Sequence, residues 1–225
     1  MAQSPVSRVI QAVARETLRP LGLFQQGRSR TWLDDHGWFV IVAEFQPSDW
    51  SQGSYLNVGC CWLWFAKSYL SFDYSFDPSS RVHGFEQFRS PEQFAPRARL
   101  LVEEAAQQVR LYRSRLRTVT DLAMHYRRRS PSGFWPCFHA AVAYGLTGQP
   151  VDAARCFRML QQEAAEIGYD WMRAASDLAE QYLGEVHDRG RFRESIEGVI
   201  QETRHLLRLP EVPRVLTPEV LGGAL

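Results

Sequence analysis

Acidic side chains in the first half of the chain are the residues best suited to acid–base chemistry. Glu44 follows an apolar run, and Asp73 lies in an alternating run that ends at Asp77. On one strand face, Asp73 and Asp77 would stand about 13 Å apart at a rise of about 3.3 Å per residue. The paired carboxyl groups of glycosidases are only about 5–9.5 Å apart. Solvated acids are therefore the favoured interpretation, and a hydrolase that uses Glu44, Asp73 or His83 is an alternative.

Motifs for other catalytic chemistries are absent from the sequence. His83 and Glu86 could bind a metal together only on a helix, which Gly84 disfavours. There is no Cys-x-x-Cys pair, no Gly-x-Ser-x-Gly turn and no glycine-rich phosphate loop before the single lysine, Lys67. We therefore expect a protein that is not an enzyme, with no bound metal and no cofactor.

The clearest charged feature is the segment Arg97–Arg129, which holds nine arginines and three acids. A basic helix could contact nucleic-acid phosphates, which makes nucleic-acid binding an alternative function. The candidate contacts are Arg110, Arg113, Arg117, Arg127, Arg128 and Arg129. The favoured interpretation is that these arginines pair with acids of the helices that follow, because sequence neighbours usually pack together. The candidate acids are Glu163, Glu166, Asp177, Glu180 and Glu185.

Aromatic residues cluster between Trp32 and Phe88 and suggest a recognition surface. Trp and Tyr are the usual anchors of protein interfaces. With the polar residues near them, the candidate binding residues are Trp32, Trp38, Glu44, Gln46, Trp50, Tyr55, Asn57, Tyr69 and Asp73. The alternative is that the helical part of the chain covers this face, which would bury Trp62 and Trp64. The expected partner is a protein or a peptide.

Residues 1–90 predict an α+β domain. Ser4 and Pro5 are typical of a helix start, and apolar residues follow at helical spacing. Alternating or continuous apolar runs then predict a four-stranded antiparallel sheet. The strands are expected over 28–33, 38–46, 55–65 and 69–76, with 81–89 either a fifth strand or a loop.

Residues 91–209 predict an all-helical domain, because the apolar period changes to about 3.6 residues. The expected elements are a long helix, whose apolar stripe runs from Leu101 to Tyr126 with a break near Thr118, and then helices over 135–146, 150–167, 171–186 and 192–207. Residues 210–225 are expected to form a mobile or surface-draped tail.

Composition agrees with a globular protein of one large or two small domains. The chain has 225 residues, 45% of them hydrophobic and 23% charged, and a formal net charge of +1. This balance excludes general disorder and a polybasic chain. No apolar stretch approaches membrane-spanning length, and residues 5–16 lack the apolar core of a secretory signal. We expect a cytoplasmic protein with reduced cysteines.

Two family resemblances extend this interpretation. Leu21–Phe24, Thr31–Trp32, Phe45–Gln46 and Leu56–Gly59 resemble, in order and spacing, the bacterial domain of unknown function with family number 4304, over residues 5 to about 90. That resemblance implies an α+β fold in the bacterial cytoplasm and no established activity; analogy with small bacterial domains suggests an immunity-protein-like role. Residues 134–207 resemble tetratricopeptide-like helical hairpins, through Ala141, Tyr144, Gly148, Ala153, Phe157 and Leu160. A helical repeat would offer a concave surface to a protein or peptide.

Overall fold

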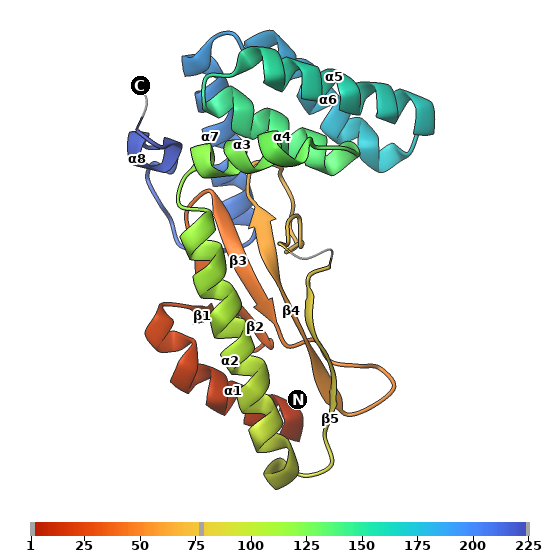
Figure 1. Ribbon diagram of the computed structural model, residues 1–225, viewed down its shortest axis with the longest axis vertical. Coiled ribbons are helices and arrows are strands. Elements are labelled where there is room, and N and C mark those ends of the chain that lie inside the picture. The colour runs from red at the N-terminus through yellow and green to blue at the C-terminus, as the bar shows by residue number, and fades with distance from the viewer. Residues whose placement is uncertain (1–2, 77–78, 224–225) are drawn as a thin grey trace. The chain divides into compact units, whose positions relative to one another are not determined.

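The structure, a computed structural model, describes residues 3–76 and 79–223 (Figure 1). They divide into two compact units. The sheet unit lies within Met1–Cys61 and Leu70–Ser114, and the helical unit lies within Trp62–Tyr69 and Arg115–Leu225. An N-terminal helix, an antiparallel sheet and a C-terminal helical region confirm the α+β fold class. The division falls after Ser114 and not after residue 90, because the first long helix packs with the sheet.

The sheet unit begins with α1 (Pro5–Thr17), where the sequence predicts a helix. The hydroxyl of Ser4 caps the helix by accepting a hydrogen bond from a first-turn amide. The residues Val6, Ile10 and Ala14 are buried along one face. The short 3-10 helix η1 (Arg19–Leu21) follows and ends at Gly22, whose φ of 90° lies in the left-handed region that glycine adopts without strain.

The sheet contains five strands among the described residues. They are β1 (Phe24–Gln25), β2 (Thr31–Asp35), β3 (Phe39–Glu44), β4 (Gly53–Trp62) and β5 (Arg81–Gln87). Their order in the sheet is their order in the chain, and the pairs β1–β2, β2–β3 and β4–β5 are antiparallel. β3 is buried from Phe39 to Ala43, which agrees with its continuous apolar run.

Residues 69–76 are predicted as the fourth strand, but no strand forms there. Tyr74 makes an isolated bridge with Cys60, whose backbone amide donates to the Tyr74 carbonyl (2.8 Å). The position next to β4 belongs instead to β5, the segment that the sequence leaves open between strand and loop. Alternation shows which side chains share a face but not which segment pairs with a given strand. The expected turn at Asp77 and Pro78 lies outside the described residues.

Helix α2 (Pro91–Arg115) packs on the sheet. Its buried stripe has helical spacing and comprises Phe94, Ala98, Leu101, Ala105, Val109 and Tyr112. The Tyr112 hydroxyl lies 3.5 Å from the carbonyl of Val58 in β4. α2 also forms ion pairs with β2 and β5 through Arg113 and Glu104. One helix thus contacts three strands, which places it in the sheet unit.

The chain leaves helical geometry after Arg115, and α3 (Val119–Arg129) begins the main part of the helical unit. A reciprocal cap starts α3: the Thr118 hydroxyl accepts from the Asp121 amide (3.1 Å), and the Asp121 carboxylate accepts from the Thr118 amide (3.2 Å). This cap explains the helix break that the sequence predicts near Thr118.

Helix α4 is the centre of the helical unit. The further helices are α4 (Phe134–Leu146), α5 (Pro150–Ile167), α6 (Asp170–Glu185), α7 (Arg189–Leu206) and α8 (Pro218–Leu221), and the first four agree with the predicted helices to within a turn. α4 packs against α3, α5 and α7, and all of its residues are buried except Trp135 and Pro136. A helix that is apolar all round is an interior helix. α4 therefore does not line an open concave surface.

The segment after residue 209 packs against the helical unit and is not a loose tail. The Glu197 carboxylate of α7 accepts hydrogen bonds from the amides of Val215 and Leu216 (both 2.7 Å). Leu216 is fully buried, and the Thr120 hydroxyl donates to the Leu221 carbonyl (2.6 Å). The expectation of a mobile or draped tail is therefore corrected up to Gly223. Apolar residues within a polar-looking segment supply the burial.

Within residues 3–76 and 79–223, no helix is both long enough and apolar enough to cross a membrane.

The contact between α4 and α7 can be tested at Gly145. A Cβ there would lie 2.5 Å from the Phe192 ring. We expect Gly145→Ala to lower the free energy of unfolding by about 1–3 kcal/mol through overpacking. Gly198→Ala on α7 is the matched control, since a Cβ there meets no atom within 4 Å; it should raise that free energy by about 0.5–1 kcal/mol. Urea denaturation measures both, and equal effects would contradict this packing.

Candidate functional site

Four of the expected binding residues meet around Asn57 of β4. The Asn57 side-chain amide donates to the Glu44 carboxylate (Oε2, 2.9 Å) and to the Gln46 side-chain oxygen (Oε1, 3.0 Å). Asn57 is only 5% exposed, whereas Glu44 and Gln46 are half-buried. Together with Tyr55 and Arg81, these residues form what we call the Asn57 cluster.

Arg81 completes the Asn57 cluster from β5. It stands opposite Asn57 in the strand register. Its guanidinium donates to Gln46 (Nη2 to Oε1, 2.8 Å), and its central carbon lies 3.9 Å from the centre of the Tyr55 ring. This is cation–π geometry. Sequence reasoning missed Arg81, because its role depends on the pairing of β5 with β4, which no local pattern reveals.

The chemistry of the Asn57 cluster is suited to recognition. It contains one carboxylate, one guanidinium, two amides and a phenol, and no imidazole, thiol or aliphatic hydroxyl. The polar groups hold one another in place by hydrogen bonds, so the half-buried carboxylate and the Tyr55 ring keep fixed positions. Such an arrangement can bind polar and aromatic groups of a partner, and it offers no obvious nucleophile.

Trp50 lies in the loop between β3 and β4, which begins next to the Asn57 cluster. The Trp50 side chain is 95% exposed. Its backbone amide donates to the Ser48 hydroxyl (3.2 Å), which shapes the loop locally. The loop returns to β4 where the Tyr55 amide donates to the Gln46 carbonyl (2.9 Å). The cluster therefore sits at the base of the loop that carries Trp50.

The structure does not bring the other expected binding residues to this place. Trp32 and Trp38 are 2% and 1% exposed, so their rings are part of the buried interior. Tyr69 is 62% exposed but belongs to the helical unit. Asp73 belongs to the sheet unit, where its backbone amide donates to the Cys60 carbonyl (2.9 Å). The sequence shows where aromatic residues cluster, but it does not show which rings face outward.

The alternative of a buried aromatic cluster is correct for Trp62 and Trp64. Both are fully buried, and their rings stack with centres 5.3 Å apart. The Trp64 indole N–H donates to the Nδ1 atom of His139 (3.0 Å), a residue of α4. These groups belong to the interior of the helical unit.

Arg113, a candidate phosphate contact, forms an ion pair within the sheet unit. Its guanidinium makes two hydrogen bonds to the Asp34 carboxylate (2.8 and 2.7 Å) and one to the Leu21 carbonyl (2.6 Å). The imidazole of His36 also contacts Asp34 (2.8 Å). Burial raises the pKa of Asp34, but the hydrogen bonds from His36 and Arg113 outweigh it, so the pKa lies below its usual value.

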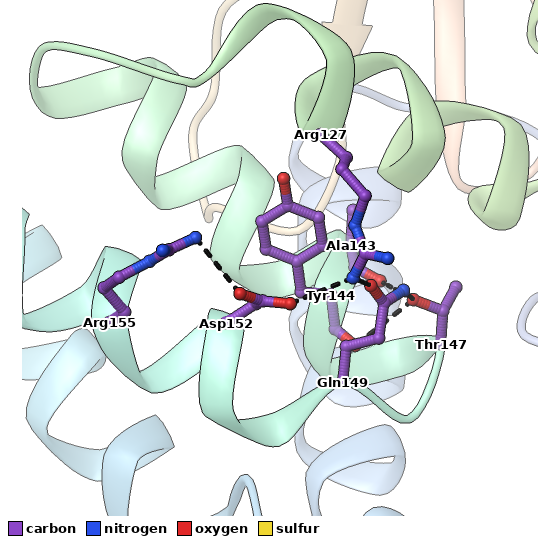
Figure 2. Close-up of polar contacts among 7 residues, drawn as sticks. All are labelled: Arg127, Ala143, Tyr144, Thr147, Gln149, Asp152 and Arg155. Atoms are coloured by element: carbon purple, nitrogen blue, oxygen red, sulfur yellow. Dashed lines mark hydrogen bonds and ion pairs between the residues drawn. The ribbon is translucent and has the colours of Figure 1, made fainter.

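Arg127 is also held by other side chains. Figure 2 shows its guanidinium between Gln149 and Asp152 at the turn from α4 to α5. The ion pair with Asp152 measures 3.0 Å, and Arg155 contacts the other Asp152 oxygen (3.1 Å). Gln149 in turn donates to the Thr147 hydroxyl (2.8 Å). Arg127 therefore fastens α3 to the α4–α5 turn.

The remaining candidate arginines do not form one basic helix face. Arg110 lies on α2 of the sheet unit, whereas Arg117 precedes α3 and pairs with Asp121 (3.4 Å). Arg128 and Arg129 are exposed at the end of α3. The partners of Arg113, Arg117 and Arg127 are not the acids that the sequence analysis favoured. In particular, Glu185 pairs with Arg191 (3.5 Å). All three arginines are paired, but only Arg127 pairs with an acid of a later helix, Asp152 of α5. The prediction is wrong for Arg113, whose partner Asp34 lies in β2.

His83 bridges two carboxylates between β5 and α2. Its Nδ1 atom lies 2.8 Å from Glu104, and its Nε2 atom lies 3.0 Å from Glu86. Both nitrogens can donate only when the ring is protonated. Burial lowers the pKa of His83, but the hydrogen bonds to Glu86 and Glu104 outweigh it and raise the pKa above its usual value. Across the described residues, no group of three or more His, Cys, Asp or Glu is placed to hold a metal ion.

Comparisons with known proteins add no relative from which function could be transferred. No protein-family model, no curated protein and no solved structure matches the chain. The resemblances of residues 5–90 and 134–207 stay predictions.

The His83 bridge gives the sheet unit a pH-dependent stability. His83 has a raised pKa in the folded protein, so its stabilisation is complete below about pH 6.5, the usual histidine value, and is lost as the pH rises through the folded pKa. The difference in unfolding free energy between wild type and His83→Gln should be largest near pH 6 and should shrink above it. Denaturant titrations at several pH values measure this difference. A His83→Gln effect that grows with pH would contradict the bridge.

Proposed function

We propose that this is a non-enzymatic protein- or peptide-binding protein and that the loop with Trp50, together with the Asn57 cluster, forms its binding surface. The observation that carries this proposal is the 95% exposure of Trp50, in a loop that begins and ends at the ordered Asn57 cluster. Single exposed aromatics next to hydrogen-bonding groups resemble the anchors and polar rims of protein interfaces.

The energetics support a role in recognition. A buried tryptophan removes about 150–250 Å² of surface from water, which is a gross gain of about 4–6 kcal/mol at 25 cal/mol per Å². The Asn57 cluster adds an arginine, a tyrosine and a carboxylate that are already held by neighbouring groups. Groups that are ordered before binding lose less conformational entropy when the partner arrives.

The sheet unit is a better candidate for the surface than the helical unit. A repeat-like binding protein uses the exposed face of its inner helices. Helix α4 would be such an inner helix in the predicted helical hairpins, but it is buried on nearly all sides. An immunity-protein-like role, in which a partner protein is masked by direct contact, belongs to the same proposal.

Capture of partners from a bacterial lysate tests the proposal with matched variants. We expect Trp50→Ala to abolish specific capture, because it removes the central anchor. Arg81→Gln should weaken capture by about tenfold, because it removes a charged hydrogen bond and the contact with Tyr55. Tyr69→Ala, at an exposed aromatic of the helical unit, is the control. Quantitative mass spectrometry that finds the same proteins with Trp50→Ala as with wild type would refute the proposal.

Nucleic-acid binding is the second candidate, because Arg128 and Arg129 are exposed together at the end of α3. Burial lowers the pKa of nearby His125, and the charges of Arg129, Arg115 and Arg128 lower it further, which indicates a positive local potential. The use of Arg113 and Arg127 in ion pairs makes this surface smaller than the sequence suggests.

A salt titration separates the two candidates. We expect wild type to bind duplex DNA only weakly, because few phosphates can be neutralised. Each phosphate contact contributes about −0.9 to the slope of log affinity against log salt concentration. A submicromolar affinity whose slope becomes less steep by about 1.8 in the Arg128→Gln, Arg129→Gln double variant would place nucleic-acid binding first. Arg110→Gln in the sheet unit is the control.

A further inference from the structure

A second candidate site lies in the sheet unit, away from the Asn57 cluster. It is a cavity of about 490 Å³ between α1 and the turn that joins β1 to β2. Its volume is in the range of pockets that hold small molecules. The capping residue of α1 and one face of the helix supply a polar stripe at spacings of three and four residues: Ser4, Ser7, Gln11 and Arg15. β1 supplies Gln25, and the turn supplies Gly27 and Arg28.

The lining carries positive charge and no carboxylate. Arg15 and Arg28 are exposed, and their guanidinium groups make no ion pair or hydrogen bond with the residues that the structure describes. A third guanidinium, that of Arg30, lies behind the two serines and is half-buried. Uncompensated cations around a concave site attract anions.

Arg30 directs the hydroxyl groups of the serines. The Ser4 oxygen accepts from the Ser7 amide (3.2 Å) and from Arg30 (3.1 Å), so its proton is left to donate to the Ser7 oxygen (2.9 Å). The Ser7 oxygen also accepts from Arg30 (Nε, 2.7 Å). A hydroxyl has two lone pairs and one proton. Both lone pairs of Ser7 are then used, and its proton is available to an acceptor in the cavity.

The turn is held against α1 in a defined position. Gln11 is buried, and its side-chain amide donates to the carbonyls of Arg28 and Ser29 (both 3.3 Å). Gly27 has a φ of 55°, and a Cβ at this residue would meet no atom within 4 Å. The backbone beside Arg28 is therefore both fixed and open toward a ligand.

We propose that this cavity binds the phosphate group of a small ligand. Guanidinium groups form strong, charge-assisted hydrogen bonds with phosphate oxygens, and a hydroxyl donor complements them. Arg15 approaches from the helix, Arg28 approaches from the turn, and Ser7 donates its proton from the helix. These donors line the same cavity from separate walls.

Calorimetric titration of the full chain tests the proposal, with inorganic phosphate and adenosine 5′-monophosphate as probes and adenosine as the uncharged control. We expect saturable binding of at least one phosphate-bearing probe and none of adenosine. Arg15→Gln and Arg28→Gln should each weaken binding by about tenfold, the usual effect of losing one charged hydrogen bond. Arg8→Gln is the matched control, since Arg8 is exposed on α1 outside the cavity. In NMR spectra the Gly27 amide signal should shift with each probe that binds.

The outcomes decide both the site and the source of the phosphate. Tighter binding of the monophosphate ester than of inorganic phosphate identifies an ester as the ligand, and equal binding identifies free phosphate; both support the site. If neither phosphate-bearing probe binds, the proposal is overturned. An equal loss with Arg8→Gln, which would indicate general surface attraction, or equal binding of adenosine also overturns it. Ser7→Ala, which leaves the charges unchanged, should also weaken binding.

Discussion

The paired hydrogen bonds between Arg113 and Asp34 hold together segments that are far apart in the chain. A buried carboxylate is costly unless a cation and hydrogen bonds compensate the lost hydration. The guanidinium supplies both, and its third bond, to the Leu21 carbonyl, ties the end of η1 to the same point. Once Arg113 is placed, the rotation of α2 about its axis is fixed, and the buried stripe from Phe94 to Tyr112 faces the sheet. The placement of α2 against the strands of the sheet unit depends on this interaction.

Local patterns in the sequence were sufficient for most elements, because caps and apolar periods are local properties. Helices α4 to α7 and the break near Thr118 follow from such signals. The prediction failed at residues 69–76, where an alternating run makes only one bridge, and at residues 210–223, where buried leucines hold a supposed tail. In both cases the outcome depends on a distant partner. A single sequence does not contain the identity of that partner in any local pattern.

Only part of the candidate site can be predicted from the sequence, for the same reason. Glu44, Gln46, Tyr55 and Asn57 are polar and aromatic residues that the sequence places on or next to neighbouring strands, and the hairpin from β3 to β4 brings them together. Arg81 comes from a strand whose pairing was open, and Trp32 and Trp38 turned inward because aromatic rings suit both cores and interfaces. For the arginines, the charge pattern predicts that ion pairs form but does not predict which acids are the partners. Opposite charge is needed for an ion pair, but proximity is decided by the fold.

Because α4 is enclosed by other helices, the helical unit differs from a stacked array of repeats in how its parts depend on one another. In a stacked repeat array each unit contacts only its neighbours, so units can be lost, gained or melted one after another. Here α3, α5 and α7 all cover the same helix, and Phe65 packs on it through Trp135 and Phe138. Loss of any one cover would expose apolar surface shared by the others. We therefore expect the helical unit to fold and unfold as one cooperative body, in which an added or deleted hairpin would open the centre.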